Sequence, residues 1–273
     1  MLQPPARLTC IEVRRRIQNN TATKPLFIRA IDAQGDEYDV ILKVQHPDVR
    51  EGHFEGTSLA CELICAVLAR AIGFSVPNYS IVEVRGGLLD GAPNTEIRAL
   101  LAANLGLHFG STFIEGCAPW LPPTEGGLEP NDGLCDRLED VLVFDAVAFN
   151  GDRKRTKSNL LWNGDDLLPI DHSLALLAHA WTPKQIAESL LFPADQIRQH
   201  CAFPSVEGQK REYIGLLDIW RNNVTDADIT ELRTFVPREW EQRPGDLDRI
   251  FDFLRGRGGH FDAIAQDLRR IAR

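Results

Sequence analysis

The chain has 273 residues, 44% of them apolar, which is enough for a sizeable hydrophobic core. Its formal net charge of −9 argues against nucleic-acid binding as a main function and against binding to anionic membranes, because both need a basic surface. The sequence shows neither a leader nor a run of about 18 apolar residues, so we expect a cytoplasmic protein without a membrane span.

Three strands are predicted at residues 7–18, 24–32 and 37–45, arranged as an antiparallel meander. Side chains alternate along a strand, so Val40 and Leu42 share one face of the third strand while Ile41 and Lys43 share the other. Lys43 is therefore expected to point into a cleft.

The next segment predicts a helix that runs from Thr57 or Ser58 to about Ile72. Glu62 lies within its apolar stripe, and a carboxylate there must reach solvent or find a cation, because unpaired burial is costly. Lys43 is the candidate partner, and an exposed Glu62 at the edge of the stripe is the alternative. Two further strands, at residues 79–85 and 107–115, flank a helical stretch at residues 96–104.

Residues 116–130 are rich in glycine and proline and indicate a hinge, after which helical patterns prevail. The helix that follows carries Asp145 on its apolar face, where we expect the carboxylate to bond to nearby backbone. Later helices are predicted at residues 207–223, 226–235 and 246–271, the last interrupted by a solvated loop around residues 254–260.

Residues 159–162 and 165–170 predict a β-hairpin, because Asn163-Gly164 between them suits a two-residue turn. With that turn Asn159 lies opposite Leu168, and Asp171 follows three residues later. The two side chains are then close enough to share a metal ion.

The segment just before this hairpin places one carboxylate among four cations, in the order Asp152-Arg153-Lys154-Arg155-Thr156-Lys157-Ser158. Transfer of a γ-phosphate needs a carboxylate that orients the attacking group, oxygen ligands for Mg²⁺ and a cation for the developing charge. This stretch and the hairpin supply all three. The alternative is a polar loop followed by an aspartate at the end of a strand.

Several segments together resemble the HipA-like kinase family, in particular its short form without a separate N-terminal subdomain. They are Val143-Phe144-Asp145-Ala146, Asn150-Gly151-Asp152-Arg153, Asn159-Leu160-Leu161-Trp162 and Ile170-Asp171-His172-Ser173. The phosphoinositide lipid kinases share the Asp-Arg pair and the later aspartate. The resemblance implies a bilobal, protein-kinase-like α+β fold. Residues 1–115 would form a small lobe with an antiparallel β-sheet and one long helix, and residues 116–273 a mainly helical large lobe.

The resemblance also implies roles for the residues of the site. Asp152 would orient or deprotonate the acceptor hydroxyl, while Asn159 and Asp171 would hold Mg²⁺ between the phosphates of ATP. Lys43, steadied by Glu62, would pair with the α- and β-phosphates.

Other implied contacts are less direct. The backbone around Glu115 to Cys117 would meet adenine. Lys154 is placed like a catalytic cation for the γ-phosphate. Six residues separate Asp152 from Asn159 where about four are common in kinases, so Lys157 is the rival candidate for this role. The turn expected over the phosphates, residues 18–23, lacks glycine. The Thr21 and Thr23 hydroxyls would contact phosphate in its place, and a plain hairpin turn is the alternative.

The expected function is ATP- and Mg²⁺-dependent transfer of a phosphoryl group to a hydroxyl acceptor, first of all a protein serine or threonine. Alternatives on the same fold are a nucleotide-binding regulatory module with weak turnover, a lipid or small-molecule kinase, and a nucleotidyl transferase. The expected partners are ATP, a protein or small-molecule acceptor and a regulatory protein.

Overall fold

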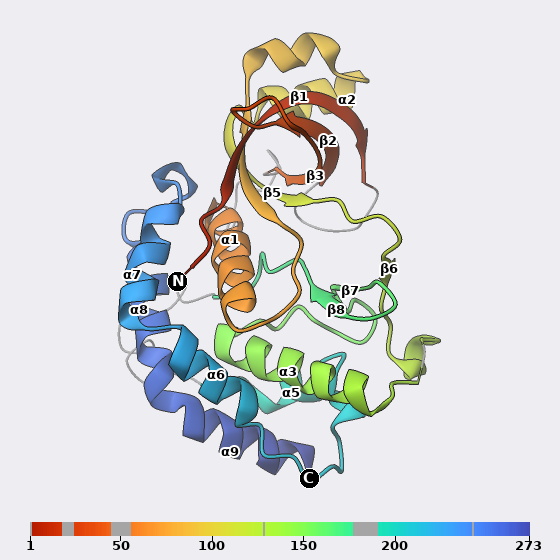
Figure 1. The fold of residues 1–273 in the computed structure, drawn as a ribbon, viewed down its shortest axis with the longest axis vertical. Coiled ribbons are helices and arrows are strands. Elements are labelled where there is room, and N and C mark those ends of the chain that lie inside the picture. Colours follow the sequence, from red (N-terminus) through yellow and green to blue (C-terminus); the bar gives the residue numbers. More distant parts are fainter. Residues whose placement is uncertain (1, 18–24, 45–55, 128, 177–190, 242) are drawn as a thin grey trace.

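The computed structural model describes residues 2–17, 25–44, 56–127, 129–176, 191–241 and 243–273. Five strands from the N-terminal part close into a barrel in the order β1-β2-β3-β5-β4, at the top of Figure 1. The strands are β1 (Ala6–Arg16), β2 (Leu26–Ile31), β3 (Glu37–Lys43), β4 (Tyr79–Val84) and β5 (Gly106–Thr112).

The expectation of a small antiparallel sheet is corrected by this closure. β1 pairs with β4 in parallel, with Ala6 opposite Ser80 and Thr9 opposite Glu83. Two register shifts within β1 bend the strand, as irregularities of this kind do, and allow it to reach both neighbours. The barrel interior is filled by apolar side chains, and α2 (Thr95–Ala102) covers one end with Ile97, Leu100 and Leu101.

The long helix α1 (Gly56–Ala71) lies between the barrel and the helical part of the molecule (Figure 1). It is rich in leucine and alanine, which favour helix, and it ends where Gly73 adopts a positive φ of 97°. Leu63, Ile64, Val67 and Leu68 of α1 are buried in the core that the C-terminal helices share. The helix that carries Glu62 is therefore packed from both sides.

The predicted hinge contains a short strand and joins a second sheet. This sheet has the order β6-β7-β8, with β6 (Ala118–Pro119), β7 (Leu160–Trp162) and β8 (Leu167–Pro169). Trp120 N–H donates to the Leu160 carbonyl (2.9 Å), and the Ser158 hydroxyl donates to the Trp120 carbonyl. The hinge is thus attached directly to the segment that carries the candidate catalytic residues.

The predicted two-residue turn between β7 and β8 is wrong, and so is the register that followed from it. Leu161 pairs with Leu168 and Trp162 with Leu167, because the Asn163 side chain accepts N–H groups from Asp165 (2.9 Å) and Asp166 (2.8 Å) and widens the turn to four residues. The Asn159 carbonyl accordingly accepts Ile170 N–H (3.0 Å). Asn159 therefore lies opposite the residue that precedes Asp171, closer to Asp171 than predicted.

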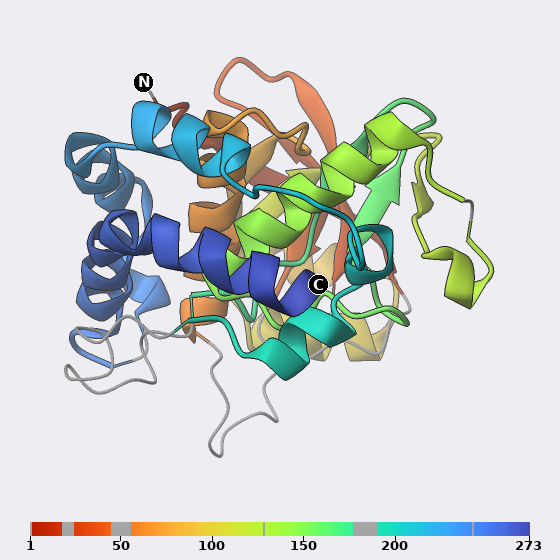
Figure 2. The same ribbon diagram turned by 90° about the horizontal axis from the view of Figure 1, so that it is seen from below.

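The rest of the described chain is mainly helical. α9 lies against α3, as the view from below shows (Figure 2). The predicted helix over residues 246–271 is broken into α8 and α9 by a 3₁₀ turn at Gly258–His260, and the one predicted from 207 begins only at Gly215, since Gly208 and Tyr213 have positive φ. The helices are α3 (Asp132–Ala148), α5 (Ala194–Gln199), α6 (Gly215–Asn223), α7 (Asp226–Phe235), α8 (Asp246–Arg257) and α9 (Phe261–Ala272).

Among the described residues, none of the helices combines the length and the apolar character that a bilayer crossing requires.

Candidate active site

A cavity of about 630 Å³ lies where the barrel, α1 and the β6-β7-β8 sheet meet. Its walls are largely apolar, and its polar groups gather where Lys43, Asp171 and Asn159 line it. Apolar wall residues include Ile41, Ala66, Val76, Phe109, Ile114 and Leu161. A mostly apolar pocket with a few converging polar groups is the usual form of a small-molecule site.

Three elements place charged side chains at the polar part of the cavity. Alternation along β3 buries Val40 and Leu42 in the barrel and turns Lys43 to the cavity, as predicted. The Lys43 ammonium donates to the Glu62 carboxylate of α1 and to Asp171 Oδ1 at 2.7 Å. The second oxygen of Glu62 accepts the His172 backbone N–H at 2.9 Å. Glu62 therefore ties β3 to the segment that carries Asp171.

Burial and opposite charge compete in this cluster. Burial alone would lower the pKa of Lys43, but the charges of Asp171 and Glu62 outweigh it and hold this pKa above its ordinary value. Burial likewise opposes ionisation of Asp171, yet Lys43 and then Lys157 keep its pKa well below the ordinary value. Burial raises the pKa of Glu62 to about 7, although Lys43 opposes the shift. The cluster thus holds a charged lysine beside an ionised aspartate.

Asp152 and Asn159 lie beside this cluster. Lys157 Nζ is 2.5 Å from Asp152 Oδ2 and 3.6 Å from Asp171 Oδ2, so it joins the two carboxylates. The Asn159 amide donates to Asp152 Oδ2 at 3.3 Å, and the Ser173 hydroxyl donates to Asp171 Oδ1 at 3.2 Å. The structure therefore brings together Lys43, Glu62, Asp152, Lys157, Asn159 and Asp171.

Of the remaining predicted site residues, one lines the cavity, two do not, and one lies outside the described chain. The Lys154 side chain is exposed, and Lys154 is absent from the residues that line the cavity. Cys117 is half-buried and lines the cavity, whereas Glu115 is exposed. Thr21 lies outside the described residues.

Asn159 and Asp171 both have left-handed backbone conformations, with φ of 50° and 57°. Asparagine and aspartate tolerate this region better than other residues with a side chain. Arg153 contacts the backbone of both segments: its guanidinium donates to the Asn159 carbonyl, and Nη1 lies 3.4 Å from the Ile170 carbonyl. One buried side chain thus spans the two strands that carry the candidate metal ligands.

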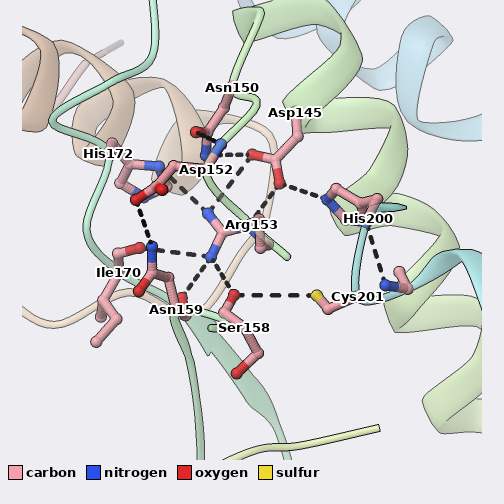
Figure 3. A network of polar contacts seen from close by, with 11 residues as sticks. Asp145, Asn150, Asp152, Arg153, Ser158, Asn159, Ile170, His172, His200 and Cys201 are labelled. Atoms are coloured by element: carbon pink, nitrogen blue, oxygen red, sulfur yellow. Dashed lines mark hydrogen bonds and ion pairs between the residues drawn. The ribbon is translucent and has the colours of Figure 1, made fainter. Parts of the chain in front are cut away.

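Beneath the site, Arg153 belongs to a buried ion network (Figure 3). Its guanidinium pairs with Asp145 of α3, whose Oδ2 also accepts His200 Nε2–H at 2.8 Å. The Ala202 N–H donates to His200 Nδ1 (3.1 Å), which leaves the proton of neutral His200 on Nε2. The prediction that Asp145 bonds to nearby backbone is wrong, because its carboxylate binds the side chains of Arg153, His200 and Asn150.

Burial opposes the charge of Asp145, but Arg153 and His200 lower the pKa of this carboxyl to about 2. Burial, followed by the nearby Arg153 charge, lowers the pKa of His172 to about 3, and burial also lowers that of His200. The network is therefore one ion pair, between Arg153 and Asp145, in contact with the neutral imidazoles of His172 and His200. It lies beneath the Asp152 loop and supports it.

Two buried residues beneath the site, His200 and Arg257, were not predicted from the sequence. His200 and Asp145 are 55 residues apart, and His200 has no local pattern that marks it. Arg257, expected in a solvated loop, is fully buried at the end of α8 and donates to the carbonyls of Ala146 and Val147 in the last turn of α3. A cation is well placed at a helix C-terminus, and a helical phase count over α8 is the only signal that could have indicated it.

The donor set fits a hard divalent cation. Asp171 and Asp152 supply carboxylate oxygens and Asn159 an amide oxygen, which are the ligand types that Mg²⁺ takes. In the part of the chain that the structure describes, no group of three or more His, Cys, Asp or Glu side chains could hold a metal. Mg²⁺ is commonly bound by one or two carboxylates together with substrate phosphates, so this set suits a cation that arrives with a nucleotide.

Comparison with solved structures shows a kinase-like fold. The chain is similar to the proinflammatory kinase CtkA of Helicobacter pylori, with a TM-score of 0.55 and 9% identity over 98% of this chain and 99% of that one. A weaker match, to the MAP kinase LmaMPK10 of Leishmania major, has a TM-score of 0.33 and 12% identity over 94% of this chain and 81% of that one. That score is too low to support an argument.

Comparison with curated proteins found no match. The profile of the HipA-like kinases matches residues 45–253, which is well over half of the chain and includes Glu62, Asp152, Asn159 and Asp171. The resemblance noted in the sequence is thereby confirmed, and the protein belongs to the HipA-like kinase family.

Proposed function

We propose that this protein is an ATP- and Mg²⁺-dependent kinase that transfers the γ-phosphate to a hydroxyl group, in the first place that of a protein serine or threonine. The observation that carries the proposal is the chain of contacts from Glu62 through Lys43 to Asp171 and on through Lys157 to Asp152. It places two lysines and the carboxylates of Asp152 and Asp171 at the polar part of an apolar cavity, as a nucleoside triphosphate requires.

In this proposal the chain works as two lobes, residues 1–115 and 116–273, with the cavity between them. Adenine lies among the apolar walls, against the backbone near Glu115 and Cys117. Ile114 and Cys117 at the two ends of this segment line the cavity, so its backbone lies beside the space that adenine would fill.

At the other end, Lys43 pairs with the α- and β-phosphates, and Asn159 and Asp171 hold Mg²⁺, which neutralises phosphate charge. The acceptor oxygen bonds to the γ-phosphorus while its proton passes to the Asp152 carboxylate. The bond from phosphorus to the bridging oxygen breaks, and ADP leaves. Lys157 faces the charge that develops on the transferred group.

The proposal is tested by incubating the protein with γ-labelled ATP, Mg²⁺ and a desalted cell lysate, beside the Asp152→Ala variant. Label in the protein fraction that disappears with Asp152→Ala is expected. Asp171→Ala should also lose it, and its Mg²⁺-dependent ATP affinity, while its thermal unfolding stays cooperative. If label reaches the product from α-labelled ATP and not from γ-labelled ATP, the reaction is nucleotidyl transfer. Binding of Mg-ATP without transfer of any label would indicate a regulatory nucleotide-binding module.

A further inference from the structure

The loop after Asp152 is longer than is common in kinases, and the structure shows what the extra residues form. Lys154 N–H donates to the Lys157 carbonyl (2.9 Å), and Lys157 N–H donates back to the Lys154 carbonyl (3.1 Å). These reciprocal bonds close a tight turn with Arg155 and Thr156 at its tip. The buried Arg153 and Ser158 anchor its two ends.

A second element brings another cation to this turn. Arg155 Nη2 donates to the carbonyl of Arg198 at 3.0 Å, and Lys154 forms a β-bridge with His200 directly after α5. The two segments also approach closely near Gly151, where a Cβ would lie 2.5 Å from Gln196 Oε1. We call the three cations Lys154, Arg155 and Arg198 the cationic rim.

The charges of the cationic rim are not neutralised within the described chain. Lys154 and Arg198 are exposed, Arg155 is half-buried, and none of the three forms an ion pair with a described carboxylate. The buried Arg155 Nε has no hydrogen-bond partner either. Several other surface arginines are paired, Arg16 with Glu96 and Arg221 with Asp262 among them. Three cations without a described carboxylate partner thus lie side by side in a chain that has 39 acidic and only 30 basic residues.

Position distinguishes the cationic rim from Lys157. Lys157 turns inward to Asp152 and Asp171 and is neutralised there, whereas the rim begins two residues after Asp152 and faces outward. An acceptor hydroxyl that reaches Asp152 brings its neighbouring groups close to this loop. Unpaired cations beside such a position attract negative charge and select against positive charge.

We propose that the acceptor is an acidic protein segment, in which the serine or threonine is flanked by aspartate or glutamate. This inference rests on the proposed kinase function and names its substrate class. The transferred group and the bonds made and broken are those given above, and the cationic rim contributes only to binding the flanking carboxylates.

The test uses three peptides with one serine each, flanked by glutamate, alanine or lysine, with γ-labelled ATP and Mg²⁺. Wild type is expected to show a kcat/KM about tenfold higher for the glutamate peptide than for the alanine peptide, the size that a few exposed ion pairs supply together. The preference should shrink as salt is raised, because exposed charges are screened. Arg155→Glu/Arg198→Glu should bring the ratio to about one or below.

The matched control is Arg7→Glu/Lys210→Glu, which changes the net charge equally at two exposed cations outside the rim. It should keep the wild-type ratio. Unchanged Mg-ATP affinity and thermal unfolding of both variants show that they are folded. The proposal is overturned if wild type shows the same kcat/KM for the glutamate and alanine peptides. It is also overturned if Arg155→Glu/Arg198→Glu keeps the preference for the glutamate peptide.

The lysate experiment with wild type and Asp152→Ala distinguishes failure of the acidic-acceptor proposal from failure of the proposed kinase function. Asp152-dependent label on proteins, mapped to serines or threonines without acidic neighbours, overturns the acidic acceptor and leaves the kinase standing. Label that goes only to lipid or small molecules also overturns it. Absence of any Asp152-dependent label overturns the kinase itself, and the acceptor proposal with it.

Discussion

At the scale of single residues, the two lysines that the sequence offers for the γ-phosphate, Lys154 and its rival Lys157, have different surroundings. Lys157 Nζ lies within 3.6 Å of both Asp152 and Asp171, whereas Lys154 is exposed and belongs to the cationic rim. A cation stabilises a developing phosphate charge only where it is held in place to meet it. We therefore propose Lys157, and not Lys154, for that role.

Lys157→Ala is expected to lower kcat about a hundredfold, as removal of one group that stabilises transition-state charge often does. Lys154→Ala is the matched control, and its kcat at saturating acceptor should stay within about threefold of wild type, since an exposed charge contributes little. Initial rates with γ-labelled ATP give both values. The reverse ranking of the two variants would return Lys154 to the catalytic role.

At the scale of elements, the barrel leaves no room for a side chain at one point of β5. A Cβ on Gly110 would lie 2.7 Å from Ser80 Oγ and Val82 Cγ2 and 2.8 Å from Val40 Cγ1, which belong to the neighbouring strands β4 and β3. The strands can approach one another there only because position 110 has no side chain. Closure of the barrel, which forms one wall of the cavity, depends on this contact.

Gly110→Ala is expected to reduce the free energy of unfolding by roughly 1–3 kcal/mol, the usual cost of overpacking a well-filled core. Gly87→Ala is the control, because a Cβ there meets no atom within 4 Å and its φ is not positive. Urea unfolding monitored by circular dichroism measures both. A Gly110→Ala protein as stable as wild type would mean that the barrel can expand at this point without cost.

A second element-scale feature is the contact of α8 with the end of α3. Arg257 is buried and donates to two carbonyls of α3 just before the Asp152 loop, while Arg255 of the same helix is exposed and pairs with Asp252. Burial lowers the pKa of Arg257 to about 10, yet the group stays charged at neutral pH. The C-terminal helices thereby support the segment that leads into the Asp152 loop.

Arg257→Met is expected to cost about 1–3 kcal/mol of unfolding free energy, because buried carbonyls lose their donors. Arg255→Met removes only an exposed ion pair and should change stability by less than about 1 kcal/mol. Thermal and urea unfolding of the two variants decide the point. Equal effects of the two substitutions would contradict the anchoring role of Arg257.

At the scale of the whole molecule, several buried histidines connect stability to pH. Burial lowers the pKa of His108 and His200 and, with Arg153, that of His172 to about 3. In the unfolded chain each imidazole returns to an ordinary pKa of about 6.5 and binds a proton that the folded protein does not. Stability therefore falls as the pH falls below about 6.5, and the His172 contribution keeps falling until about pH 3.

Glu62 acts in the opposite direction over part of this range. Burial raises its pKa to about 7, so between pH 7 and its ordinary pKa of 4.5 the folded state binds a proton that the unfolded state does not. The free energy of unfolding therefore gains from Glu62 as the pH falls from 7 toward 4.5. The proton that Glu62 binds in the folded state offsets the proton that one of the three histidines binds in the unfolded state. A net loss of roughly 1–3 kcal/mol per pH unit below about pH 6.5 is expected from urea unfolding. In His108→Gln the slope should decrease, and a wild-type stability that rises on acidification would refute the account.

Much of the site was predictable from the sequence because its chemistry is carried by residue type and order. Alternation along residues 37–45 predicted that Lys43 points into a cleft, and the apolar stripe of the following helix indicated that Glu62 must reach solvent or find a cation, with Lys43 as the candidate. Their contact is present in the structure. The cluster around Asp152, Asn159 and Asp171 identified the family that the profile match confirms.

The remaining features were decided by contacts between residues that are distant in the chain. The parallel pairing of β1 with β4, which closes the barrel, joins segments about 74 residues apart, from Ala6 to Ser80, and has no local period. The β7-β8 register was set by the turn, in which the Asn163 side chain accepts the N–H groups of Asp165 and Asp166, and not by the sequences of the strands.

The sequence by itself therefore determined the family of the protein and most residues of the candidate site, since residue type and order along the chain carry both. Only the tertiary structure decided which of two lysines meets the two aspartates, which histidine supports Asp145, and how closely Asn159 and Asp171 approach. These choices depend on packing between separate elements, because the partner of each charge comes from another segment of the chain.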